Sequence, residues 1–130
     1  MSNTKYSNSR TGMLAAVMLA SVAAVPVAAD TQQDCFGTRG MGRIEACTRL
    51  LEEPLPPAER SYAYAMRALA YSLQGRFKSA IADYDKAIEI APDFAVALNN
   101  RAWAYFKSGV LDDADRDVAR ALELSPESPH

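Results

Sequence analysis

The feature that most constrains this chain is a repeat of 34 residues in its C-terminal half. Residues 61–94 and 95–128 align without a gap and are identical at 11 of the 34 positions. The stretches RALAYSLQG and RAWAYFKSG, which begin at Arg67 and Arg101, show the similarity most clearly. A fixed period of this length is typical of stacked helical or strand-containing units, each of which buries its apolar face against a neighbour.

Each repeat predicts two helices. Tyr64, Ala68 and Tyr71 lie three and four residues apart, which places them on one face of a first helix. Gly75 then suits a left-handed helix end, and Pro92 blocks further helix. Between these two residues a second apolar series has helical spacing: Phe77, Ala80, Ile81, Tyr84, Ala87 and Ile88. We therefore expect an all-α fold of antiparallel helix-turn-helix repeats.

This order of residues resembles the tetratricopeptide repeat family. In the first repeat the family positions are Tyr64, Ala68, Tyr71, Gly75, Ala80, Tyr84, Ala87 and Pro92. In the second repeat they are Leu98, Ala102, Tyr105, Gly109, Ala114, Val118, Ala121 and Pro126. The resemblance implies a short right-handed α-solenoid that binds other proteins as an adaptor or scaffold.

The segment before residue 61 predicts part of a third unit. Ala46 and Leu50 lie one period before Ala80 and Tyr84, which indicates a second helix that ends at the prolines from Pro54 onward. Its partner helix is shortened to TQQDCFG. The expected organisation is a signal peptide (1–29), a degenerate, disulfide-stapled half-repeat (30–60), repeats at 61–94 and 95–128, and a tail (129–130).

The first residues have the composition of a secretory signal peptide. Lys5 and Arg10 precede an apolar run at residues 13–25, and small residues follow up to Ala29. We expect cleavage after Ala29 and an exported, periplasmic or secreted protein without stable membrane insertion. The alternative is a retained anchor, but a membrane-spanning helix needs about 20 apolar residues. The remaining chain has 12 basic and 16 acidic residues without a basic cluster, so we expect no nucleic-acid partner.

Cys35 and Cys47 are the only cysteines of the chain. In an oxidising compartment they are expected to form a structural disulfide that fastens the shortened helix to its neighbour. The alternative is a redox-active pair, which usually has two intervening residues rather than eleven.

The sequence offers little for catalysis. The only histidine is His130, which removes most metal sites and histidine-based acid–base chemistry. Carboxylates gather on the second helices: Asp83, Asp85, Asp112, Asp113, Asp115 and Asp117. A solvated outer face explains them better than a glycosidase pair, and the LDDADRD stretch lacks the glycine and closing glutamate of a calcium loop. We expect no cofactor, no metal and no enzyme; a small exported enzyme is the least favoured alternative.

Two charges recur with the repeat. Arg67 and Arg101 stand where many tetratricopeptide units have leucine, and Asp83 and Asp117 share one offset on the second helix. We predict two ion pairs, Arg67 with Asp83 and Arg101 with Asp117, because arginine suits a forked contact with a carboxylate. The alternative is two sets of solvated surface charges.

The resemblance also places a groove. In similar proteins the first helices line a concave surface that holds a peptide or a partner protein. The corresponding residues here are Tyr62, Ala65, Leu69, Ser72, Val96, Asn99, Trp103 and Phe106, with Phe94, Asn100 and Lys107 nearby. The alternative is that Trp103 and Phe106 belong to the core. The last helix is expected to expose Leu111, Val118 or Leu122, which a partner or a second copy in a homodimer could cover.

Overall fold

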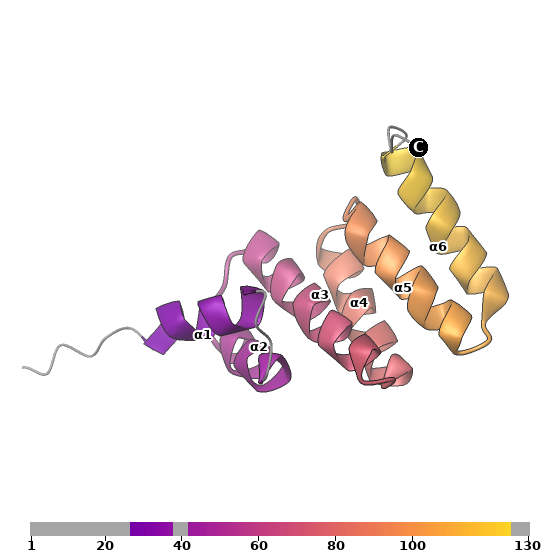
Figure 1. The fold of residues 1–130 in the computed structure, drawn as a ribbon. Helices are drawn as coiled ribbons and strands as arrows, with labels where there is room; N and C mark the ends of the chain where they lie inside the picture. The colour runs from indigo at the N-terminus through magenta and orange to yellow at the C-terminus, as the bar shows by residue number, and fades with distance from the viewer. Residues whose placement is uncertain (1–26, 38–41, 126–130) are drawn as a thin grey trace, which may run out of the picture.

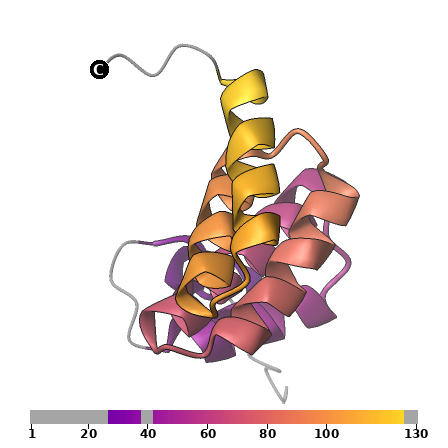
Figure 2. The ribbon, with the colours of Figure 1, turned by 90° about the vertical axis from the view of Figure 1, so that its right-hand side faces the viewer.

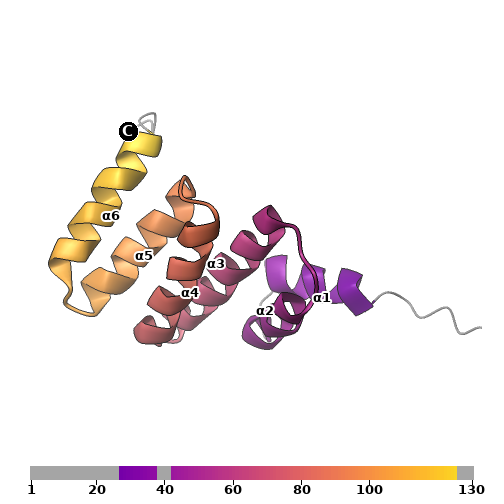
Figure 3. The ribbon, with the colours of Figure 1, turned by 180° about the vertical axis from the view of Figure 1, so that it is seen from behind.

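The computed structural model describes residues 27–37 and 42–125. This part of the chain consists of six helices and contains no strand. The helices are α1 (Val27–Phe36), α2 (Arg43–Glu52), α3 (Pro57–Leu73), α4 (Phe77–Ile90), α5 (Ala95–Lys107) and α6 (Leu111–Leu124). They form three antiparallel pairs that stack side by side (Figures 1 and 3). The prediction of an all-α solenoid is confirmed.

The pairs are arranged in two layers. The first helices α1, α3 and α5 contact one another in turn, whereas α2, α4 and α6, as described, do not. Each of α2 and α4 instead packs against its own first helix and the first helix of the next pair. The first helices therefore form the inner, more closely spaced layer of the stack (Figure 1).

Glycine ends the first helix of both repeats. Gly75 and Gly109 have φ angles of 73° and 78°, in the left-handed region that a residue with a Cβ rarely adopts. After each glycine the next amide returns to the last turn: Arg76 N–H donates to the Tyr71 carbonyl at 2.9 Å, and Val110 N–H to the Tyr105 carbonyl at 2.9 Å. The same turn therefore sets the angle between the two helices of both repeats.

Helix α3 begins at Pro57, four residues before the repeat boundary expected at residue 61. Proline fits the first turn of a helix because its missing N–H would have no partner there. The Arg60 guanidinium donates to the carbonyl oxygens of Leu51 (3.1 Å) and Glu53 (2.8 Å). These bonds join the start of α3 to the end of α2.

The core between the helix pairs is made mostly of alanine. Small side chains at the contacts let the helices approach closely. A few large side chains fill the space that the alanines leave between the helices. Tyr84 is the largest of the completely buried side chains. The cluster joining α3, α4 and α5 contains Ala65, Ala68, Ala80, Tyr84, Ala87, Ala97 and Ala104.

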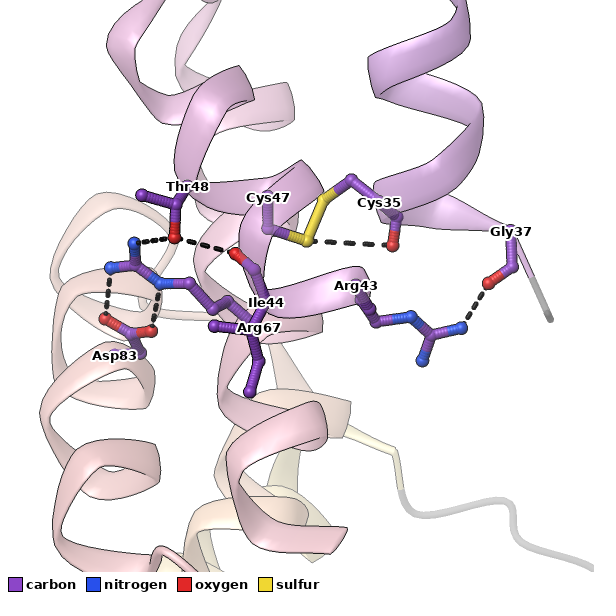
Figure 4. Close-up of a disulfide and its surroundings, with 8 residues drawn as sticks. All are labelled: Cys35, Gly37, Arg43, Ile44, Cys47, Thr48, Arg67 and Asp83. Atoms are coloured by element: carbon purple, nitrogen blue, oxygen red, sulfur yellow. Dashed lines mark hydrogen bonds and ion pairs between the residues drawn. A yellow bond between two sulfur atoms is a disulfide. The ribbon is translucent and has the colours of Figure 1, made fainter. Parts of the chain in front are cut away.

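A disulfide joins Cys35 of α1 to Cys47 of α2, as predicted (Figure 4). The two Cα atoms are 4.7 Å apart, and both residues are completely buried. With ten residues, α1 is shorter than α3 and α5, which have 17 and 13. The disulfide holds this short helix against the stack, together with apolar contacts from Leu50 and Ala63.

Both recurring arginines bind their aspartates through two hydrogen bonds. Arg67 Nε and Nη2 donate to the Asp83 carboxylate at 2.6 and 2.9 Å (Figure 4). Arg101 Nε and Nη2 donate to the Asp117 carboxylate, both at 2.7 Å. Asp83 and Asp117 are only 5% and 6% exposed. The interpretation of these two carboxylates as part of a solvated face was therefore wrong, whereas Asp85 is exposed.

The third nitrogen of each arginine reaches the preceding helix pair. Arg67 Nη1 donates to Thr48 Oγ1 of α2 at 2.9 Å, and Arg101 Nη1 donates to Asp85 of α4 at 2.8 Å. The hydrogen-bonded carboxylate of Asp117 is the main reason that the pKa of Arg101 is raised. Each arginine thus connects three helices, which explains why it stands where the family often has leucine.

We expect Asp83→Ala to lower the free energy of unfolding by about 3 kcal/mol, because it leaves the Arg67 guanidinium buried without its partner. In the double variant with Arg67→Ala the loss should be clearly smaller than the sum of the single losses. Urea unfolding followed by circular dichroism measures this. Additive losses would show that the two side chains do not stabilise each other, and Arg120→Ala at an exposed ion pair serves as control.

Candidate partner-binding face

Exposed apolar side chains concentrate on the last helix pair. The described residues expose nine large hydrophobic side chains, and seven of them lie on α5, α6 and the turn between. They are Val96, Trp103, Phe106, Val110, Leu111, Val118 and Leu122. We call this surface the end face. Figure 2 looks onto this end of the stack, with α6 nearest the viewer.

Two shallow hollows lie between α5 and α6 on the end face. The first, of about 290 Å³, is lined by Ala95, Val96, Asn99, Val118, Ala121, Leu122 and Ser125. The second, of about 300 Å³, is lined by Asn99, Ala102, Trp103, Phe106, Ala114, Asp115 and Val118. Asn99 and Val118 border both hollows, so the two form one continuous trough with apolar walls and few polar groups.

The two repeats use the predicted groove positions differently. Ala65 and Ser72 of α3 are buried (3% exposed each), and Leu69 is half-buried, because α5 packs over the α3–α4 pair. Their counterparts Asn99 and Phe106 of α5 are exposed. The expectation that Ala65 and Ser72 line the groove was wrong, because the next first helix covers these positions.

The Trp103 side chain is packed against α4 on one side and exposed to solvent on the other. Its ring meets Phe77 of α4 edge-on at 5.5 Å between centroids, yet 45% of its surface is exposed. The Lys107 ammonium lies 6.0 Å from the ring centre, and Phe106 is 62% exposed. Trp103 is therefore held in place by α4 and still offers apolar surface, a combination common in residues that dominate binding.

A row of three aromatic rings crosses the junctions between the pairs. Tyr62 of α3 meets Phe36 of α1 edge-on at 4.7 Å, and on its other side it stacks with Phe94 at 6.3 Å. Tyr62 is 38% exposed, so the row is partly accessible. Phe36 was not predicted from the sequence, because its counterparts 34 and 68 residues later are alanines, Ala70 and Ala104.

Asn100 lies away from the end face. It is half-buried beside the Tyr84 hydroxyl, and the buried Ser72 lies beside the same hydroxyl, although neither contact has the geometry of a full hydrogen bond. Burial is the main reason that the pKa of Tyr84 is raised, to about 12. Of the two neighbouring asparagines, only Asn99 thus borders the trough.

The described residues contain neither a metal-binding cluster nor a membrane-spanning helix. Within residues 27–37 and 42–125, no group of three histidine, cysteine or acidic side chains is placed to hold a metal ion. None of the six helices is long and apolar enough to cross a membrane. The apolar run at 13–25, Pro126, the tail and His130 lie outside the described residues.

Comparison with known proteins identifies the repeats. Two family models described as tetratricopeptide repeat match residues 61–94 and 83–116. The first match coincides with the first predicted repeat. Residues 61–116 therefore contain tetratricopeptide repeats, which generally bind other proteins.

Individual relatives share only part of their length with this chain. DnaJ homolog subfamily C member 3 from Bos taurus is 36% identical over 64 residues, which are 49% of this chain and 13% of the relative. The human protein of the same name is 34% identical over the same length. Among solved structures, the crystal structure of MamA protein has a TM-score of 0.56 at 30% identity, covering 65% of this chain and 45% of MamA.

Because Trp103 is the only tryptophan of the chain, its fluorescence reports on the end face. We expect emission typical of a solvent-exposed indole and efficient quenching by acrylamide, since 45% of the residue is exposed. Emission at short wavelength and resistance to acrylamide in the isolated protein would contradict an open end face. Repeating the measurement over a range of protein concentrations separates self-association from a different fold.

Proposed function

We propose that this protein is an exported adaptor that binds a peptide or partner protein in the cell envelope through its end face. The observation that carries this proposal is the concentration of seven exposed large apolar side chains on one helix pair. Contiguous exposed apolar surface is unfavourable in water, so soluble proteins keep it mainly where a partner covers it. The trough between α5 and α6 gives this surface the shape to receive a partner.

The charged groups favour a binding role over an enzymatic one. A carboxylate that acts as acid or base needs to reach a substrate, whereas here Asp83 and Asp117 are buried in ion pairs with arginine. Asp85 is bound by Arg101, and Asp113 by Arg116. Asp83, Asp85 and Asp117 thus connect different helices of the stack, whereas Asp113 pairs within α6. None of these four carboxylates is free to act on a substrate.

The self-associating homodimer stays the second candidate, because the same apolar end face could pair with itself. A two-fold dimer would use one self-complementary patch on both copies. Sedimentation velocity distinguishes the candidates. A monomer supports a separate partner, and a dimer that Trp103→Ala dissociates supports self-association.

The binding role is tested by affinity capture from an envelope extract with the wild-type protein, Trp103→Ala and Leu73→Ala. Leu73 is the matched control, since it is 74% exposed at the end of α3, outside the end face. We expect wild type and Leu73→Ala to recover the same partner, and Trp103→Ala to recover at most a tenth as much. Equal recovery of the partner by all three proteins would show that the partner does not bind at the end face.

Export is proposed from the basic, apolar and small-residue order of residues 1–29 together with the disulfide. Cleavage after Ala29 would remove the first three residues of α1 and keep Cys35 in the mature protein. We expect mass spectrometry of the protein from the producing cells to give a chain that begins at Asp30. An intact N-terminus in the membrane fraction would support the retained anchor instead.

A further inference from the structure

The end face is the third occurrence of a surface that the chain buries twice. Leu50, Tyr84 and Val118 occupy equivalent positions on α2, α4 and α6, at intervals of 34 residues. Leu50 is 2% exposed and Tyr84 is 0% exposed, because α3 and α5 pack over them, whereas Val118 is 40% exposed. No helix in the described ranges covers the third surface. The helices that cover the first two therefore indicate what the third can accept.

We propose that the end face binds a single amphipathic α-helix of another protein, which packs across α5 and α6 as α5 packs across α3 and α4. This inference rests on the proposed function and adds the structure and charge of the partner. Its main support is continuity with the two internal interfaces. In both of them the surface formed by one helix pair is covered by one helix.

In the two internal interfaces, α3 and α5 are the helices that cover the preceding pair, and we call them covering helices. Both have small side chains at the contact. α3 presents Ala63 and Ala70, and α5 presents Ala97 and Ala104, in each case seven residues apart. Ala63, Ala97 and Ala104 are completely buried at these contacts. Because the distance between packed helices depends on the side chains at the contact, a partner helix needs small residues at two positions seven apart.

The interface that α5 forms with the preceding pair also contains one large apolar side chain of the covering helix. On α5, Trp103 follows Ala97 by six residues and packs against Phe77 of the preceding pair. The residue 34 positions after Phe77 is Leu111, which is 54% exposed on the end face. A large apolar side chain six residues after the first small residue of the partner would cover Leu111.

The covering helices carry a positive charge at one fixed position. Arg67 follows Ala63 by four residues, and Arg101 follows Ala97 by four. Both arginines use one nitrogen to donate to the second helix of the preceding pair. Their acceptors there are oxygen atoms of Thr48 and Asp85.

On the end face both of these hydrogen-bond acceptors are missing, and one of them is replaced by a positive charge. The position of Thr48 is occupied by Arg116 of α6, and the position of Asp85 by Ala119, so neither side chain can accept a hydrogen bond. Arg116 is largely exposed, with 74% of its side chain accessible, and it contacts Asp113 of its own helix. An arginine on a covering helix would here meet a like charge. A glutamate or aspartate would meet an opposite one, so the partner carries an acidic residue four positions after its first small residue.

Other charged side chains lie near the end face, and two of those on α6, Asp112 and Asp113, are acidic residues in its first turn. Arg120 points toward the preceding turn, where it lies 3.4 Å from Asp93. Asp115 borders the hollow beside Trp103. A second copy of the chain offers a poorer match, because α3 and α5 carry arginine at the critical position and α1 has the uncharged Gln33 there.

The test uses two end-capped, fluorescein-labelled peptides that copy residues 94–108, which include all of α5. One keeps the arginine that corresponds to Arg101, and the other has glutamate in its place. Because arginine and glutamate have similar helix propensities, the peptides differ mainly in charge. Fluorescence anisotropy with the disulfide-bonded protein should show that the glutamate peptide binds about fivefold more tightly, as expected for exchanging a like-charged contact for an opposite one.

Variants of the protein test whether Arg116 causes the preference for the glutamate peptide. Arg116→Glu should reverse the preference, so that the arginine peptide binds more tightly. Arg120→Glu is the matched control, since it makes the same charge change on the side that faces Asp93, and it should keep the wild-type preference. Trp103→Ala should weaken the binding of both peptides about tenfold.

Four results would overturn the inference. Equal affinity of the two peptides, or an unchanged preference in Arg116→Glu, would show that Arg116 does not select the partner's charge. A dimer that Trp103→Ala dissociates would assign the end face to a second copy. Failure of both peptides to bind, while the envelope partner is still captured through Trp103, would reject a helical partner and leave the proposed function standing.

Discussion

The stack depends on the fact that no helix pair can bury its own broad face. Each pair has a small-residue surface with one larger residue, Leu50 or Tyr84, that the first helix of the following pair must cover. Stability in such an arrangement comes from neighbours rather than from a single central core. The same dependence leaves the surface around Val118 in water. Folding and binding therefore use one kind of interface.

The arginines Arg67 and Arg101 give this apolar stacking its register. Contacts between alanine side chains alone define the relative position of two packed helices only weakly. Two parallel hydrogen bonds between a guanidinium and a carboxylate, in contrast, fix both the distance and the angle between these groups. The additional bond of each arginine to the preceding helix pair fixes the junction with that pair as well. Burying such charges costs free energy that the hydrogen bonds must offset, so loss of one partner costs more than the intact pair contributes to stability.

The sequence predicted most of the features that repeat. The period, the glycine turns at Gly75 and Gly109, and the Arg–Asp pairs each occur twice, so one occurrence supports the other. The disulfide was predictable because two cysteines permit one pairing. Features that occur only once were harder to predict from the sequence. Pro57 as the start of α3 and Phe36 in the aromatic row have no counterpart one period away.

The predicted groove shows a further limit. Ser72 and Phe106 occupy equivalent positions on the first helices of the two repeats, yet Ser72 is buried and Phe106 is exposed. Whether a position is accessible depends on the helix that packs next to the repeat, and residue type or spacing within the repeat does not record this. The family resemblance placed these positions correctly on the first helices, but only the packing of α5 over α3 and α4 separates those that can bind from those that cannot.

The first helix pair is fastened in a different way from the other two. Where α3 and α5 have their arginines and α4 and α6 their aspartates, α1 and α2 have Gln33 and Arg49, which cannot form the same pair, and the Cys35–Cys47 bond joins the helices instead. The first helix pair is therefore joined by a covalent bond, whereas the described helices of the other two pairs are held together by noncovalent contacts. A denaturant such as urea separates the noncovalent contacts but leaves the covalent bond intact.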